Sequence, residues 1–222
     1  MDFIKTVSLI FKAMKQTKGK TIISTIFTDL GGVLLTNGWD RRAREEAVRR
    51  FGLDAKETQE RHYLTFDTYE VGKLTLNEYL ERVVFYKKRN FTVEVFRKFM
   101  YSCSKADPKM IQLMKDLKER HGLKIAVVNN EGRELNDYRI NKFKLTSFVD
   151  FFISSSFVHF RKPDVDIFKL ALDVAQTNPR KILYLDDRPL FVQVAAGVGI
   201  RGIVHSNYDD TVERLAKLGL TL

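Results

Sequence analysis

One segment near the start of the chain, TIISTIFTDLGGVLL (21–35), sets the expected architecture. Its first part is rich in β-branched residues and ends at Asp29, and the turn-forming pair Gly31-Gly32 follows. Runs of β-branched residues favour extended backbone, and paired glycines interrupt it. The segment 21–29 is therefore predicted to be a buried strand that ends in an acidic side chain and a tight turn.

Further apolar runs with polar residues at their carboxyl ends recur along the rest of the chain. They are KIAVVNN (124–130), FVDFFISS (148–155), KILYLDD (181–187) and, more weakly, RGIVHS (201–206). Apolar residues at helical spacing occupy the segments 108–120, 132–142, 164–176 and 189–198. This alternation predicts an α/β fold in which helices cover both faces of a parallel sheet.

The first two predicted strands are separated by far more chain than one crossover helix requires. Asp29 and Asn129 lie 100 residues apart, whereas a strand–helix–strand unit takes roughly 30 residues. The excess shows apolar residues at i, i+3 and i+4 and little alternation. We therefore expect an α-helical cap at 38–106, inserted into a core made of 21–37 and 107–222, at the sheet edge where ligands bind.

Residues 1–20 are predicted to form an amphipathic, basic N-terminal helix, with apolar residues at helical spacing through 3–14 and lysines around them. A lysine inside the apolar part argues against a secretory signal, and no apolar run reaches the ~18–20 residues of a membrane span. We therefore expect a cytoplasmic protein. Three roles fit the segment 3–14: packing on the domain, weak contact with a membrane surface or a protein, and organelle targeting.

The composition is that of a basic globular chain. It has 222 residues, of which 44% are hydrophobic, and a formal net charge of +10, which favours anionic partners such as phosphorylated metabolites. The basic residues are dispersed and form no nucleic-acid-binding motif, so no specific nucleic-acid partner is expected. The single cysteine, Cys103, excludes an intramolecular disulfide, and the four histidines lack the spacing of a zinc site.

Polar side chains stand at the carboxyl ends of the predicted strands, where an open parallel sheet binds its ligands. They are Asp29, Asn129, Asn130, Asp186 and Asp187, and Lys162 begins the segment after the third strand. Three carboxylates repel one another unless a cation lies between them, and oxygen ligands without Cys or His favour Mg²⁺. Carboxylates, Mg²⁺ and a lysine around one crevice are typical of phosphoryl transfer.

Each of these residues also has a purely structural interpretation. A strand-end aspartate often caps the next helix, and Asp187 with Pro189 fits a helix start. The motifs TDLGGVL, VVNN, RKPD and LDD nonetheless occur in this order on successive strand ends. One shared site explains this order better than four unrelated helix caps.

On these motifs the chain resembles the haloacid dehalogenase (HAD) superfamily over about 21–205. TDLGGVLL (28–35) is similar to the first family motif, VVNNEG (127–132) to the second, RKPDVDIF (161–168) to the third, and LYLDDRP (183–189) with AAGVGI (195–200) to the fourth. The resemblance implies a Rossmann-like core with strand order 5-4-1-2-3. It also implies a four-helix cap inserted after the first motif.

The resemblance further implies a role for each motif residue. Asp29 would be the nucleophile that forms an aspartyl-phosphate, and Lys162 would hold Asp29 and the phosphoryl group. Asn129 stands at the position of the phosphate-binding hydroxyl, with Asn130 beside it as a substrate ligand. The implied Mg²⁺ ligands are Asp29, the carbonyl of Gly31, Asp186 and Asp187.

Three residues depart from the family pattern. Gly31 stands where most phosphatases of the family carry a second aspartate, which protonates the leaving group and then activates water. General acid–base help of this kind is worth ~10²–10⁴ in rate. Asn129 replaces a smaller hydroxyl side chain, and Phe191 replaces an asparagine that follows the acidic pair.

The expected function is that of an Mg²⁺-dependent phosphatase acting on a small phosphorylated metabolite, with a sugar phosphate as one candidate. The alternative is a catalytically degenerate HAD-like protein that binds a phosphorylated ligand or a partner without turnover, because Gly31 supplies no acid or base. A metal-free dehalogenase is a third possibility, against which the pair Asp186-Asp187 argues. Two interpretations fit the cap residues Trp39, Arg41, Tyr63, Phe66, Tyr69 and Glu70. They face the active site, or they are ordinary residues of the cap core and surface, which is the commoner case.

Overall fold

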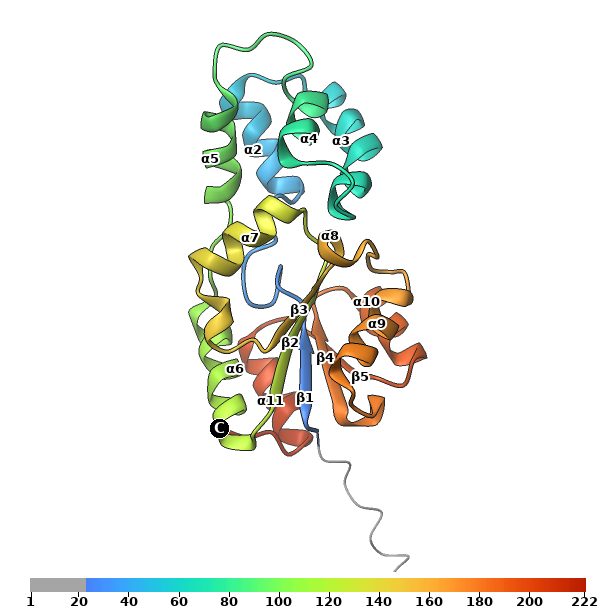
Figure 1. The fold of residues 1–222 in the computed structure, drawn as a ribbon. Helices are drawn as coiled ribbons and strands as arrows, with labels where there is room; N and C mark the ends of the chain where they lie inside the picture. Colours follow the sequence, from blue (N-terminus) through green and yellow to red (C-terminus); the bar gives the residue numbers. More distant parts are fainter. Residues whose placement is uncertain (1–22) are drawn as a thin grey trace, which may run out of the picture.

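A computed structural model describes residues 23–222; the helix predicted at 1–20, including its contact segment 3–14, lies outside these residues. The five strands are β1 Thr25–Thr28, β2 Lys124–Asn129, β3 Phe151–Ser154, β4 Ile182–Asp186 and β5 Arg201–Val204. All neighbouring strands pair in parallel, in the order β3-β2-β1-β4-β5 (Figure 1). This is the predicted order 5-4-1-2-3 taken from the other edge, so the fold class and the strand order are confirmed.

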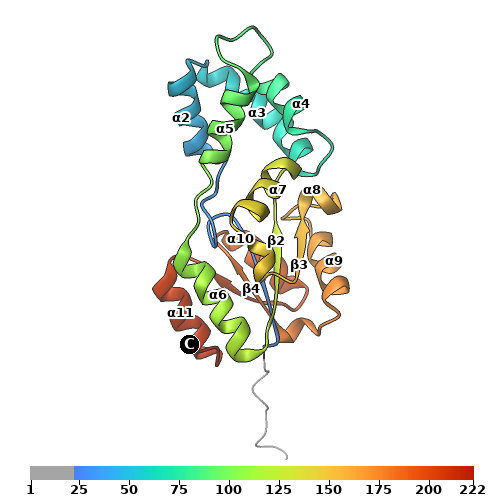
Figure 2. The same cartoon turned by 60° about the vertical axis from the view of Figure 1, so that its left-hand side comes forward.

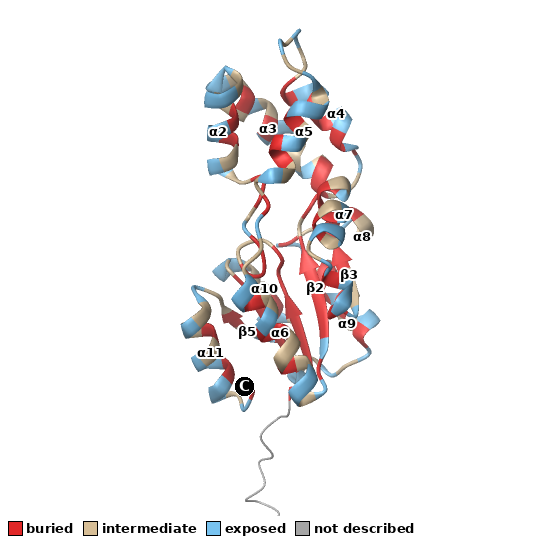
Figure 3. Ribbon diagram, turned by 90° about the vertical axis from the view of Figure 1, so that its left-hand side faces the viewer, coloured by how far each residue is buried: buried red, intermediate tan, exposed pale blue. Residues whose placement is uncertain are grey.

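Both faces of the sheet are covered by helices. In β1, Ile26 packs into the core on one face and Phe27 into the core on the other. The covering helices are α6 Pro108–His121 and α11 Tyr208–Lys217 on the first face, and α9 Asp166–Ala175 and α10 Pro189–Gly197 on the second (Figures 1 and 2). Burial on both faces explains why the strands appear as continuous apolar runs, and β2 is buried along nearly its whole length (Figure 3).

One predicted strand is shorter than its apolar run. The run FVDFFISS (148–155) contributes only the four residues of β3. A 3-10 turn, Leu145–Ser147, precedes it, and the short helix α8, Ser155–Val158, begins directly after it. Within residues 23–222, no helix is both long and apolar enough to cross a bilayer.

Four helices between β1 and α6 form a separate layer beyond the carboxyl ends of the strands (Figures 1 and 2). They are α2 Arg41–Phe51, α3 Ala55–Glu70, α4 Leu76–Val83 and α5 Val93–Ser102. Each begins at a side chain that accepts a hydrogen bond from the third helical amide, and these capping residues are Asp40, Asp54, Thr75 and Thr92. The four helices bury an aromatic core of their own, in which Trp39 Nε1 donates to Tyr79 Oη at 2.8 Å.

The four-helix segment is fixed to the sheet layer by polar contacts at several places. The chain enters and leaves the segment side by side, where Thr36 N donates to Lys105 O at 2.8 Å. At the far side, Ser155 Oγ donates to the carbonyl of Glu70 at 2.7 Å. Between these contacts, Leu76 N at the start of α4 donates to Glu134 Oε1, on α7 Arg133–Lys142, at 2.9 Å. The four helices therefore stand over the sheet edge at which Asp29 ends its strand.

Candidate active site

Asp29 and Asp186 are brought together by the pairing of β1 with β4. The two strands are neighbours with Thr28 opposite Leu185, so the residues that follow share one edge of the sheet. The amide of Asp29 continues the ladder by donating to Leu185 O at 2.7 Å. Two carboxylates far apart in the sequence thus lie at adjacent strand ends.

Lys162 lies between these two carboxylates. Its Nζ is 3.0 Å from Asp29 Oδ1 and 2.8 Å from Asp186 Oδ2, and its side chain is fully buried. Burial opposes the charge of Lys162, but the two carboxylates outweigh it, so the pKa of Lys162 is raised. Burial raises the pKa of the Asp29 carboxyl to about 7, against the opposing effect of Lys162. A further positive charge at this place would favour the ionised form of Asp29.

The residues present suit a divalent cation. Asp29, Asp186 and Asp187 each offer a carboxylate oxygen, and these three oxygens lie within 4.8 Å of one another. Asp187 Oδ1 is buried without a hydrogen-bond partner, and its ion-pair partner, Arg188 Nε, is 3.6 Å away; a bound cation would offset this weakly paired charge. A Cβ at Gly32, whose φ is +73°, would collide with the Asp187 carboxylate, so only glycine fits there. An all-oxygen set of this kind is typical of Mg²⁺.

Tyr184 belongs to this charge cluster, although the sequence analysis did not single it out. Its hydroxyl lies 3.0 Å from Lys162 Nζ and donates to Asp186 Oδ2. Burial, followed by the nearby Asp186 charge, raises the pKa of Tyr184 well above its usual range, so the hydroxyl stays neutral. Tyr184 precedes Asp186 by two residues on β4, so both side chains point to the same face of the sheet. This spacing is the feature of the sequence from which Tyr184 could have been predicted to lie near Asp186.

The two asparagines of the second motif are held by the protein itself. Asn129 Nδ2 donates to Asn136 at 3.0 Å, and Asn129 Oδ1 accepts from Ser154 Oγ at 2.7 Å. Asn130 pairs with the backbone of Lys162, donating to its carbonyl and accepting from its amide, both at 2.8 Å. Asn130 and Lys162 both line the cavity described below. The two hydrogen bonds from Asn130 therefore fix the backbone of Lys162 at the cavity wall.

A cavity of about 720 Å³ lies between the sheet edge and the four-helix segment. From the sheet layer, Asp29, Gly31, Asn130, Glu131, Lys162 and Asp187 line it. From the four-helix segment, Trp39, Arg41, Tyr63, Phe66 and Glu70 line it. Tyr69 does not; it stacks on Tyr79 inside the helical core. Phe191 lines the cavity and places its ring centre 5.0 Å from Lys162 Nζ.

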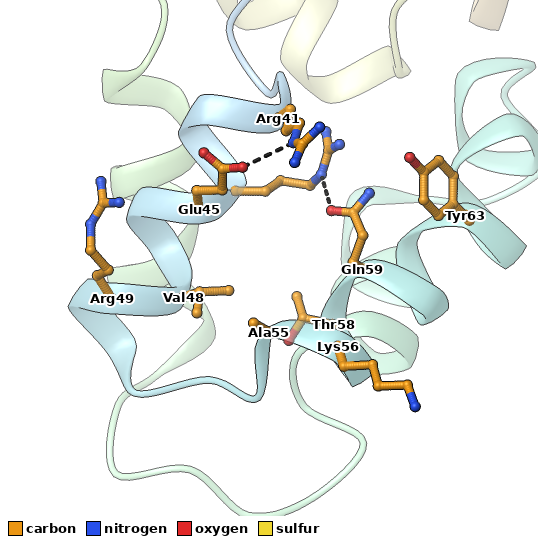
Figure 4. A pocket seen from close by; sticks show the side chains of 10 residues that line it. Arg41, Glu45, Val48, Arg49, Ala55, Lys56, Thr58, Gln59 and Tyr63 are labelled. Atoms are coloured by element: carbon orange, nitrogen blue, oxygen red, sulfur yellow. Dashed lines mark hydrogen bonds and ion pairs between the residues drawn. The ribbon is translucent and has the colours of Figure 1, made fainter.

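A second cavity of about 540 Å³ opens between α2 and α3 (Figure 4). Arg41, Arg44 and Tyr63 line both cavities, so the two adjoin at these residues. Arg44 is only 8% exposed, and its guanidinium donates to the neutral acceptors Trp39 O at 2.9 Å and Gln59 Oε1 at 3.3 Å. The four-helix side of the site therefore offers a buried cation beside aromatic rings.

A buried ion pair that the sequence analysis did not predict also borders the main cavity. Arg139 Nη1 lies 2.6 Å from Glu131 Oε2, and both side chains are almost completely buried. Arg139 passes so close to Gly38 that a Cβ there would collide with its guanidinium. Glu131 is part of the second motif, VVNNEG (127–132), but its partner is eight residues away on α7, so the motif alone did not indicate the pair.

The comparisons with known proteins agree with this geometry. A family model of haloacid dehalogenase-like hydrolases matches residues 23–199. Flavin mononucleotide hydrolase 1 of Arabidopsis thaliana, a chloroplastic protein, is 25% identical over 78% of this chain and 69% of its own.

Solved structures of this family share the fold. A HAD family enzyme from Bacteroides thetaiotaomicron in complex with magnesium is 20% identical, with a TM-score of 0.74 over 87% of this chain and 98% of its own. A predicted HAD-like hydrolase from Porphyromonas gingivalis is 19% identical, with a TM-score of 0.71 over 90% of this chain and 100% of its own. The family model covers most of the chain, and the chain therefore belongs to the haloacid dehalogenase-like hydrolases.

Proposed function

We propose that the protein is an Mg²⁺-dependent phosphatase that hydrolyses a small phosphate monoester through an aspartyl-phosphate on Asp29. The proposal is supported above all by one juxtaposition: three carboxylates offer oxygens within 4.8 Å of one another, and Lys162 lies between two of them. Two of the three, Asp29 and Asp187, line the cavity. We treat the segment 38–106 as the cap over this cavity. The haloacid dehalogenase alternative is weaker, because a metal-free site gains nothing from the pair Asp186-Asp187.

The roles of the residues follow from their positions. Asp29 attacks phosphorus; its oxygen–phosphorus bond forms as the ester bond breaks, and water later displaces the phosphoryl group and frees the carboxylate. Lys162 keeps Asp29 oriented and offsets its charge. When bound by Asp29, Asp186, Asp187 and the carbonyl of Gly31, Mg²⁺ supplies charge neutralisation for the transferring phosphoryl group.

The substrate is proposed to be the phosphate ester of a planar or polar group that fits beneath the cap. The rings of Trp39, Phe66 and His62 at the cavity wall suit a flat aromatic group. Burial lowers the pKa of His62 to about 3, so its ring is neutral and adds no charge. Flavin mononucleotide, the substrate named for the Arabidopsis relative, is therefore the first compound to test, followed by sugar phosphates. The screen measures phosphate release with and without Mg²⁺.

Binding of Mg²⁺ itself is expected to stabilise the fold. At about 100 times Kd, a ligand that binds only the folded state adds about 2.7 kcal/mol, which raises Tm by roughly 5–10 °C for a chain of this size. Thermal melting in MgCl₂, compared with NaCl of equal ionic strength, measures this shift. Asp187→Asn should lose most of it, whereas Asp173→Asn, on the exposed side of α9, should keep it. An equal shift in both variants would remove Asp187 from the metal site.

Arg44 is expected to contribute to substrate binding. A hydrogen bond to a charged group is worth about 1.5–3 kcal/mol, so Arg44→Met should lower kcat/KM roughly 10- to 100-fold, mainly by raising KM. Arg82→Met, at an exposed residue of α4 outside both cavities, is the matched control and should leave KM unchanged. Equal KM values in the two variants would place the substrate away from Arg44.

A second candidate function is binding of a phosphorylated ligand or a protein partner without turnover. It is favoured by the glycine at position 31 and by Asn129, both of whose amide atoms are engaged by Asn136 and Ser154. Isothermal titration with inorganic phosphate and Mg²⁺, run beside the hydrolysis screen, separates the two functions. Binding without release of phosphate from any ester would support the second, and clear turnover would remove it.

The cellular location is proposed to be the cytoplasm, with organelle targeting by residues 1–20 as the alternative. The basic composition of this segment supports the alternative, as does the chloroplastic relative. Fusion of residues 1–22 to a fluorescent protein would distinguish the two, because only a targeting segment redirects its cargo.

A further inference from the structure

The proposed phosphatase needs a proton donor that Gly31 does not supply. A Cβ built on Gly31 would lie 3.1 Å from Asn37 Oδ1 and 3.9 Å from Arg139 Nη1. Arg139 therefore borders the space into which an acidic side chain at position 31 would extend. The question is whether another acid reaches this space from a different element.

Glu131 is that acid. Its Oε2 lies 2.6 Å from the same Nη1 of Arg139, so one guanidinium nitrogen spans the gap between Glu131 and the Gly31 position. Glu131 borders the cavity that Asp29 also borders. Its backbone is fixed as well, because its amide donates to Ser155 Oγ at 2.9 Å. A carboxyl group from the start of the second crossover thus pairs with the guanidinium that borders the position where the first motif lacks an acid.

We propose that Glu131 is the general acid and base of this enzyme, in place of the residue missing at position 31; the inference rests on the proposed phosphatase function. As Asp29 attacks phosphorus and the ester bond breaks, the carboxyl proton of Glu131 passes to the leaving oxygen, which departs as an alcohol. The Glu131 carboxylate then takes a proton from water as the water oxygen attacks phosphorus. The bond between phosphorus and Asp29 breaks, and inorganic phosphate leaves.

The surroundings of Glu131 suit both proton transfers. Burial raises the pKa of Glu131 to about 7, while Arg139 acts in the opposite direction. The carboxylates of Glu70 on α3 and Asp29 on β1 also raise it. Tyr69, on which the Glu131 charge also acts, is neutral, because burial raises its own pKa well above the usual range. A group with a pKa near the working pH can both give and take a proton.

The test is the dependence of rate on the leaving group in Glu131→Gln. A general acid matters for a basic leaving group and hardly at all for one that departs as a stable anion. We expect Glu131→Gln to lose about 10²- to 10⁴-fold in kcat/KM on phenyl phosphate and little on 2,4-dinitrophenyl phosphate. Glu134→Gln, three residues along in the first turn of α7 and outside the cavity, is the matched control, because an amide oxygen still accepts the bond from Leu76 N.

An equal loss on both esters would show a structural role for Glu131 and overturn the inference, as would no loss on either. If Glu131→Gln does not fold, the wild-type protein gives the answer. Its kcat/KM on phenyl phosphate should fall relative to that on 2,4-dinitrophenyl phosphate as pH rises through 7, because the acid form is lost; a ratio independent of pH would contradict this. Failure of the proposed function looks different, since then neither ester releases phosphate.

Discussion

Replacing Asp29 with asparagine is expected to abolish phosphate release, lowering kcat by on the order of 10⁶-fold, as removal of a nucleophile does in other enzymes. The amide keeps the shape of the side chain but cannot form the aspartyl-phosphate. Because burial already raises the pKa of the Asp29 carboxyl to about 7 and Lys162 keeps Asp186 as its partner, a neutral side chain at position 29 should destabilise the fold less than loss of Lys162 does. The measurement combines Mg²⁺-dependent phosphate release with a denaturant unfolding curve.

The control for this variant is Asp173→Asn, which changes the same side chain on the exposed part of α9. It should retain full activity. An Asp29→Asn protein that still releases phosphate at a comparable rate would exclude Asp29 as the nucleophile. A protein that loses both activity and folded structure would instead show that the carboxylate is needed for the fold.

The second large effect is expected in the stability of Lys162→Met. The methionine fills similar space but leaves the carboxylates of Asp29 and Asp186 facing one another in a buried place. Loss of one partner from a buried ion pair typically costs about 3–5 kcal/mol. Without the lysine, which lowers it, the pKa of the buried Asp29 carboxyl should rise further, so the folded state binds more protons than the unfolded state. The variant should therefore lose stability as pH rises, and the deficit should be smaller at pH ~5.5 than at pH ~7.5.

Lys169→Met is the matched control for this measurement. Lys169 pairs with Asp166 on the surface of α9, where its side chain is 58% exposed. Surface ion pairs contribute little, so its urea midpoint should not change measurably. If the two lysine variants unfold at the same midpoint, Lys162 does not hold the two carboxylates together in the way described.

Much of the fold could be predicted because the sequence pattern follows from burial. Strands buried on both faces appear as short apolar runs, and the carboxyl ends of parallel strands must share an edge. Asp29, Lys162 and Asp186 are therefore predicted to share one crevice, and Lys162 Nζ lies 2.8–3.0 Å from the two carboxylates. The strand FVDFFISS (148–155) was predicted too long, because apolar residues also pack in the 3-10 turn and the α8 segment that flank β3.

The rest of the site could not be predicted because it depends on contacts between distant elements. Asn129 and Asn130 appeared as residues of the crevice, but which groups engage their amides depends on where Asn136, Ser154 and Lys162 fall in space. The ion pair between Glu131 and Arg139 likewise joins a loop residue to a residue of α7, and both side chains line the cavity. Sequence periodicity places a residue on a face of its own element and does not identify its partner on another.

The claim that Asp29 and a divalent cation together receive a phosphoryl group is tested most directly with beryllofluoride, which mimics an acyl-phosphate on a carboxylate and needs no knowledge of the substrate. Fluorine NMR of the protein with beryllofluoride and Mg²⁺ should show bound fluoride signals in slow exchange. These signals should vanish when Mg²⁺ is withdrawn and in Asp29→Asn, while Asp173→Asn keeps them. Bound signals that persist in Asp29→Asn, or that never form in the wild-type protein with Mg²⁺, would contradict the account.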